Sequence, residues 1–144
     1  MAMAEKKKAR VSPVVRSRAR ERALQFLFGL EFTNYAWQDV LERFWVLNPP
    51  KASVREYAEW LIDGVASHRE ELDSDIQSVV ESWAPGRIGH VERNIIRLAL
   101  FEMRYGEDVP AGVAINEAIE LAKRFGSDEA PRFINGVLDR LKGD

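Results

Sequence analysis

Residues 91–105 read VERNIIRLALFEMRY, and this stretch decides the class of fold. Apolar side chains cover most of the circumference of the helix that it would form, and a narrow polar stripe holds Gly89, Arg93, Arg97 and Arg104. A helix that is apolar nearly all round has to be enclosed by other helices. The stretch therefore predicts the central helix of a bundle.

The sequence before this stretch also shows helical spacing of apolar residues. The helices predicted there cover residues 12 to about 33, 37 to 47, and 53 to 84 with a bend near 67–70. Pro13 suits a first helical position because its missing amide donor costs nothing there. Ser53-Val54-Arg55-Glu56 has the pattern of a capping box, which predicts a helix start at Ser53.

Two more helices are predicted after it, over residues 112–125 and from 128 or 129 to 141. Gly126 is expected as a left-handed cap between them. Gly136, inside the last helix, costs about 1 kcal/mol relative to alanine, so another helix is expected to approach closely there. Strand signals are weak throughout, and the sequence predicts an all-α single domain of six to seven helices.

The composition excludes several classes of protein. The chain has 144 residues, 46% of them hydrophobic, which suffices for one domain with a real core. The absence of cysteine excludes thiol chemistry and fits a cytoplasmic protein. Apolar runs reach only three or four residues, so no membrane span is expected. We expect residues 1–11 to be a flexible basic leader and residues 12–144 to be the folded domain.

Charge is distributed unevenly along the chain. Residues 1–22 hold eight basic and two acidic side chains, a net charge of +6, whereas the whole chain carries -2. In a helix Arg16 and Arg20 lie one turn apart, as do Arg18 and Arg22. Arginine presents a planar fork of donors that suits phosphate groups. The basic start thus indicates a polyanion-binding segment, with a solvated tail as the alternative.

Enzyme chemistry has little support in the sequence. The two histidines, His68 and His90, lie near no serine-nucleophile motif and have no second histidine one turn away. Phosphate-binding glycine loops are absent, and the GxxG at residues 86–89 is interpreted as a helix end. We therefore expect no catalytic residues and no bound metal.

The most specific pattern lies in the final third of the chain. Residues 109–126, VPAGVAINEAIELAKRFG, and residues 132–139, RFINGVLD, strongly resemble the C-terminal signature of the NusB family of bacterial transcription antitermination factors. Residues 16–25, RSRARERALQ, resemble that family's arginine-rich first helix, and residues 91–102 resemble its central helix. Residues 34–60 match only in helical pattern.

This resemblance implies a NusB-like fold of two packed helical subbundles, without catalytic activity or cofactors. It also implies binding to boxA-type single-stranded RNA of ribosomal RNA operons, together with NusE, a ribosomal protein of the small subunit. Such a factor joins the antitermination complex of RNA polymerase and helps it read through terminators.

The resemblance also suggests site residues by position. The RNA-binding positions that it implies are Arg16, Arg18, Arg20, Arg22, Glu129, Arg132 and Phe133. The positions that it implies for contact with NusE are Phe28 and Glu92.

Three residues depart from the family pattern. Ser17 interrupts an arginine run, Phe28 lacks a tyrosine hydroxyl, and Pro131 replaces a polar residue, so each can remove one contact. Phe133 and Tyr105 are candidates for stacking on RNA bases, although aromatic residues at helical spacing more often belong to a core.

Two other functions remain open at this stage. A NusB-like domain also precedes the catalytic part of some ribosomal RNA methyltransferases, so the chain could be an RNA-binding accessory module. It could also be a self-associating interaction module, since some family members are homodimers.

Overall fold

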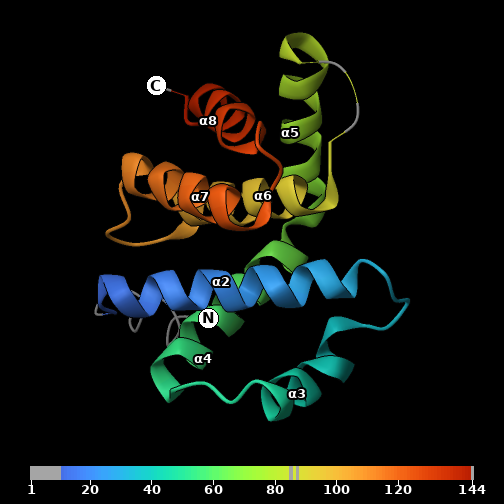
Figure 1. Cartoon of the computed structure of the whole chain (residues 1–144), viewed down its shortest axis with the longest axis vertical. Helices are drawn as coiled ribbons and strands as arrows, with labels where there is room; N and C mark the ends of the chain where they lie inside the picture. The colour runs from blue at the N-terminus through green and yellow to red at the C-terminus, as the bar shows by residue number, and fades with distance from the viewer. Residues whose placement is uncertain (1–10, 85, 87, 144) are drawn as a thin grey trace.

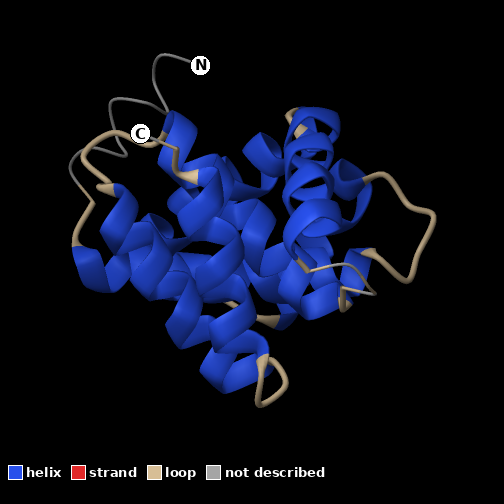
Figure 2. Ribbon diagram, turned by 90° about the horizontal axis from the view of Figure 1, so that it is seen from above, coloured by secondary structure: helices blue, strands red, loops and turns tan. Residues whose placement is uncertain are grey.

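The computed structural model describes residues 11–84, 86 and 88–143. Residues 1–10, which make up most of the predicted leader, lie outside the described residues. The described part contains seven helices and no strand (Figure 2). The helices are α2 (Pro13–Leu30), α3 (Trp37–Leu47), α4 (Ala52–Ser67), α5 (Arg69–Trp83), α6 (His90–Tyr105), α7 (Ala111–Phe125) and α8 (Ala130–Leu141).

The helices form two packed groups. α2, α3 and α4 form one group, and α5 to α8 form the other (Figure 1). α2 packs on α4 within its own group and on α6 across the boundary. The predicted all-α fold with two subbundles is confirmed.

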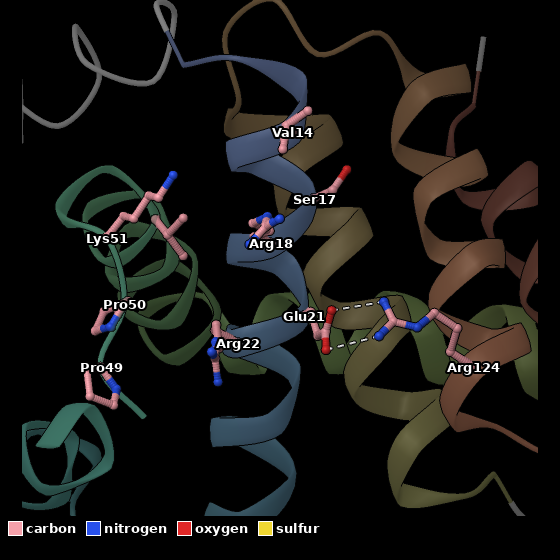
Figure 3. Close-up of a pocket in the computed structure, with 10 residues that line it drawn as sticks. Val14, Ser17, Arg18, Glu21, Arg22, Pro49, Pro50, Lys51 and Arg124 are labelled. Atoms are coloured by element: carbon pink, nitrogen blue, oxygen red, sulfur yellow. Dashed lines mark hydrogen bonds and ion pairs between the residues drawn. The ribbon is translucent and has the colours of Figure 1, made fainter. Parts of the chain in front are cut away.

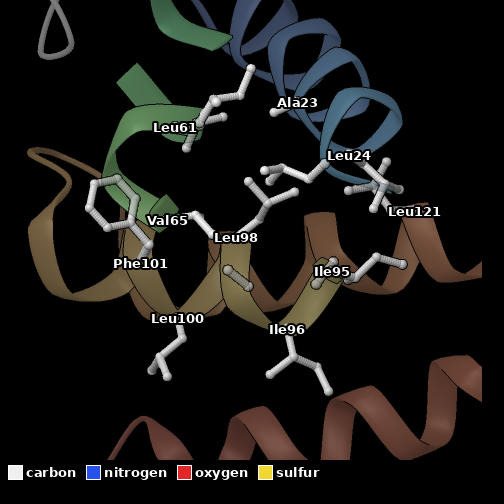
Figure 4. Packing of buried hydrophobic residues seen from close by; sticks show 14 of the residues in the cluster. Ala23, Leu24, Leu61, Val65, Ile95, Ile96, Leu98, Leu100, Phe101 and Leu121 are labelled. Atoms are coloured by element: carbon white, nitrogen blue, oxygen red, sulfur yellow. The ribbon is translucent and has the colours of Figure 1, made fainter. Parts of the chain in front are cut away.

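α6 is the central helix, as its sequence predicts. It contacts α2, α4, α5, α7 and α8, and all residues from 94 to 102 are buried. Leu98 points toward Leu24 and Leu61, while Ile96 and Leu100 point to the opposite side, toward α8 (Figure 4). Burial of each large apolar side chain contributes about 1.5–3 kcal/mol, so this helix holds both groups together.

Glycine allows close contact at two helix crossings. A Cβ on Gly136 would lie 2.1 Å from Cη2 of Trp83 in α5, which confirms the predicted close approach. A Cβ on Gly64 of α4 would lie 1.9 Å from Cζ of Phe101 in α6. Both crossings therefore depend on the absence of a side chain.

Most predicted helix boundaries are confirmed. The Ser12 hydroxyl accepts a hydrogen bond from Val15 N at 3.2 Å and caps α2, and Pro13 is its first residue. The predicted bend is the break between α4 and α5 at His68.

Two local predictions are wrong. The N-cap of α4 is Lys51 and not Ser53. The backbone is extended at Lys51 and helical from Ala52 onward, so Ser53 lies inside the first turn. Gly126 is not left-handed, since its φ and ψ are -99° and -178°. A Cβ on Gly126 would lie 2.8 Å from that of Ala130, so tight packing rather than a left-handed turn favours glycine there.

A membrane-spanning segment needs both length and a mostly apolar composition, and no helix within residues 11–84, 86 and 88–143 combines the two.

Candidate nucleic-acid interface

The arginines of α2 lie on two different faces of the helix. Arg16 and Arg20 are buried, with 9% and 4% of their surfaces exposed, and they face the other helices. Arg18 is exposed and Arg22 half-buried, and both line a surface pocket. The predicted spacing of one turn is correct for each pair, but only the second pair is available to a ligand.

Arg20 is held in a buried ion pair. Its Nε and Nη2 donate to the Glu102 carboxylate at 2.7 and 2.8 Å, and its Nη1 donates to Glu117 at 3.0 Å. The hydroxyl of Tyr57 donates a short hydrogen bond to the same Glu102. Burial alone would lower the pKa of Arg20, but the hydrogen bond with Glu102 raises it, so the guanidinium stays charged.

Neither buried arginine belongs to an exposed row of cations. Arg16 Nη1 donates to the carbonyl oxygen of Asp108 at 3.3 Å, which ties α2 to the loop before α7. The Ser17 hydroxyl donates to Glu117 at 2.6 Å. Arg16 and Arg20, two of the four arginines that the resemblance implies for RNA binding, are therefore not exposed cations: Arg20 ties α2 to α6 and α7, and Arg16 ties it to the loop before α7.

The pocket beside Arg18 and Arg22 has a volume of about 610 Å³. It is lined by Val14, Ser17, Arg18, Glu21, Arg22, Pro49, Pro50, Lys51, Val54 and Arg124 (Figure 3). Arg124 Nη1 and Nη2 donate to Glu21 at 2.9 and 3.1 Å. Within the part of the chain that the structure describes, Arg18, Arg22 and Lys51 have no carboxylate partner.

Sequence reasoning missed Lys51 and Arg124. Lys51 is an isolated basic residue, whereas Arg124 follows Lys123 within the family-like stretch 109–126; neither position in the sequence indicates that it lies beside α2. Only the packing of α4 and α7 beside α2 brings them to this pocket, so no local signal could have found them.

The other predicted RNA-binding residues gather at the start of α8. A second pocket, of about 400 Å³, is lined by Ile88, Gly89, Glu92, Ser127, Glu129, Ala130 and Phe133. It brings together Glu129 and Phe133, predicted to bind RNA, and Glu92, predicted to bind NusE. Arg132 is exposed but does not line this pocket.

Phe133 is partly a core residue. It is half-buried, and its ring stacks on Trp83 with 6.2 Å between centroids. Arg140 covers Trp83 with its guanidinium 4.1 Å from the ring centroid. Tyr105 packs against His68 at 4.2 Å and donates from its hydroxyl to Glu71 at 3.0 Å. Both aromatic rings thus have a packing role.

Phe28 lies near the start of α6. It is 36% exposed and packs edge-on against Phe32 at 5.1 Å, and Phe32 in turn contacts the ring of His90 at 5.3 Å. His90 and Glu92 lie in the same first turn of α6. Phe28 and Glu92, the two residues predicted to contact NusE, therefore belong to segments that lie next to each other.

The histidines have structural contacts. His68 Nδ1 lies 2.9 Å from the carbonyl oxygen of Gly64, and His90 Nδ1 lies 3.0 Å from Glu31. Among the described residues, no three acidic or histidine side chains are placed to hold a metal ion.

These features define a class of protein: a small all-helical domain with arginine and lysine side chains around a surface pocket. Such a pocket suits the phosphates of a nucleic acid. Comparison of the sequence with known proteins identifies the family within this class. The chain belongs to the NusB family, whose sequence pattern matches residues 17–142.

Curated relatives match nearly the whole chain. The chain is 46% identical over 127 residues to the transcription antitermination protein NusB of Anaeromyxobacter dehalogenans. The alignment covers 88% of this chain and 89% of that protein. It is 44% identical over 129 residues to that of Bacillus subtilis, covering 90% and 95%.

Solved structures agree with the fold. T. maritima NusB superposes with a TM-score of 0.78 at 32% identity, covering 90% of this chain and 91% of that one. The NusB chain in a crystal structure of the antitermination factors NusB and NusE with double-stranded RNA has a TM-score of 0.79 at 25% identity, covering 91% and 98%.

Proposed function

We propose that this protein is a bacterial transcription antitermination factor that binds boxA-type RNA together with NusE and helps RNA polymerase read through terminators. The names of its relatives and the contents of the NusB–NusE–RNA crystal structure support this function. In this role it binds rather than catalyses, and it works in the cytoplasm, where bacterial transcription takes place.

The unpaired cations of α2 carry the proposal. Arg18 and Arg22 face a pocket open to solvent and have no carboxylate partner in the described residues, so their donors are available to phosphate oxygens. We assign the phosphate contacts of α2 to these two residues. Arg16 and Arg20 support the site by holding α2 in place.

The second pocket completes the proposed interface. Phe133 lines this pocket with a half-buried ring that a base can contact, and Arg132, the residue before it, offers an exposed cation. Glu92 and Phe28 would face NusE, since ribosomal proteins are basic and a carboxylate complements them.

A salt titration tests the RNA contacts of α2. We expect the double variant Arg18→Gln and Arg22→Gln to bind a boxA-like RNA more weakly, and the slope of log affinity against log salt to fall by about 0.7 for each lost contact. The matched control is Arg43→Gln with Lys142→Gln, two exposed cations outside the pocket. An unchanged slope in the first variant would reject the assignment, and titrations with NusE and with scrambled RNA measure partner dependence and specificity.

A further inference from the structure

The pocket beside α2 has a second cationic wall. Lys51 lies across the gap from Arg18 and Arg22, on the segment that joins α3 to α4 (Figure 3). Its side chain makes no capping hydrogen bond to α4 and no ion pair with a described residue. α2 and the segment that joins α3 to α4 therefore both contribute cations without a described carboxylate partner to one pocket.

Side-chain contacts between α3 and α4 hold this wall in place. Arg55 donates to Glu42 of α3 at 2.6 Å and to Glu59 of α4 at 2.8 Å. Trp45 Nε1 donates to the same Glu59 at 2.8 Å. These contacts fix the segment that lies between the two helices.

The connecting segment itself is also restrained. Pro49 and Pro50, which precede Lys51, have fixed φ angles, and Val54 is 5% exposed. Little backbone entropy remains to be lost when a ligand binds, so the backbone of Lys51 is in position before binding.

The residues that line the pocket suit the RNA backbone better than stacked bases. None of the described residues that line it is aromatic, so these residues offer no stacking surface. Lysine acts as a point charge, which suits phosphate oxygens better than base edges. Glu21 neutralises Arg124 through two hydrogen bonds, so the free positive charge comes from Arg18, Arg22 and Lys51.

We propose that this pocket is a two-walled clamp for the RNA backbone, in which Lys51 opposes Arg18 and Arg22 and binds phosphate without reading sequence. The RNA strand then runs between α2 and the α3–α4 connection rather than along α2 alone. This inference rests on the proposed RNA-binding function, and it adds Lys51 to the site.

The test compares Lys51→Gln with Lys142→Gln in the full chain. Lys142 is an exposed lysine that pairs with Asp139 on α8, outside the pocket, so the two variants lose the same charge. Affinity for a boxA-like RNA and for a scrambled RNA is measured by fluorescence anisotropy over a range of salt concentrations. Circular dichroism checks that both variants are folded.

We expect Lys51→Gln to weaken binding of both RNAs by the same factor and to lower the salt slope by about 0.7, while Lys142→Gln changes neither. An unchanged slope and affinity in Lys51→Gln would overturn the clamp, and weaker binding of the boxA-like RNA alone would show that Lys51 reads bases. If the double variant of Arg18 and Arg22 also binds normally, the proposed function of α2 fails as well. If only Lys51→Gln binds normally, the clamp alone is wrong.

Discussion

Arg20 of α2 and Glu102 of α6 form a bidentate ion pair inside the domain, with N to O distances of 2.7 and 2.8 Å. The side chains are 5% and 1% exposed. The pair lies where the two groups of helices meet, so an arginine that sequence alone suggests as an RNA ligand joins the groups instead.

Removing one partner of this pair should destabilise the fold. Glu102→Gln leaves the buried charge of Arg20 poorly compensated, and we expect a loss of about 3–5 kcal/mol in the free energy of unfolding in urea. Glu120→Gln is the control, because Glu120 forms a surface ion pair with exposed Lys123 and, within the described part of the chain, with no other residue. A loss below about 1 kcal/mol for Glu102→Gln would mean that the pair contributes no more than a surface pair.

A methyl group at Gly64 should loosen the contact between α4 and α6. Phe101 is 2% exposed and cannot move away from the new Cβ, so we expect Gly64→Ala to cost about 1–3 kcal/mol despite better helix propensity. Gly29→Ala is the control, since no atom lies within 4 Å of its Cβ position, and it should be neutral or slightly stabilising. Equal unfolding temperatures for the two variants would contradict the packing argument.

The contribution of Asp73 to the free energy of unfolding should change with pH. Burial alone would raise the pKa of Asp73, but hydrogen bonds and the charge of Arg97 lower it below its ordinary value. A lowered pKa means that the carboxylate stabilises the fold above its unfolded pKa of about 3.9, and that this contribution is lost as pH falls through the folded pKa. Asp73→Asn should therefore be less stable than the natural chain at pH 7, and the two should converge in acid.

Urea unfolding at a series of pH values below 7 measures this difference. Asp139→Asn serves as the control, because its carboxylate forms a surface ion pair with exposed Lys142. A difference between Asp73→Asn and the natural chain that stayed constant down to acidic pH would contradict the assigned pKa shift.

Glu21 should weaken RNA binding. Among the described residues that line the α2 pocket it is the only carboxylate, and it holds Arg124 through two hydrogen bonds. Glu21→Gln frees Arg124 for phosphate, so we expect tighter binding and a salt slope steeper by up to about 0.7. The same titration of Glu120→Gln controls for the change in net charge, and weaker binding of Glu21→Gln would show that the ion pair itself shapes the site.

Local pattern was enough to predict most of the fold. The apolar spacing of residues 91–105 identified the central helix, and Pro13, Pro49 and Pro85 marked helix ends, because proline restricts the backbone wherever it occurs. The two wrong predictions, at Ser53 and Gly126, concern single residues whose backbone angles depend on their neighbours in space.

The sequence by itself determined an all-helical domain, its family and a basic first helix, since these follow from periodicity and motifs along the chain. Only the tertiary structure decided which arginines are available to RNA. Arg20 is buried because Glu102, 82 residues away, packs beside it, and Lys51 joins the pocket because α4 packs on α2. Burial and charge pairing depend on contacts between distant segments, and a local sequence pattern does not specify them.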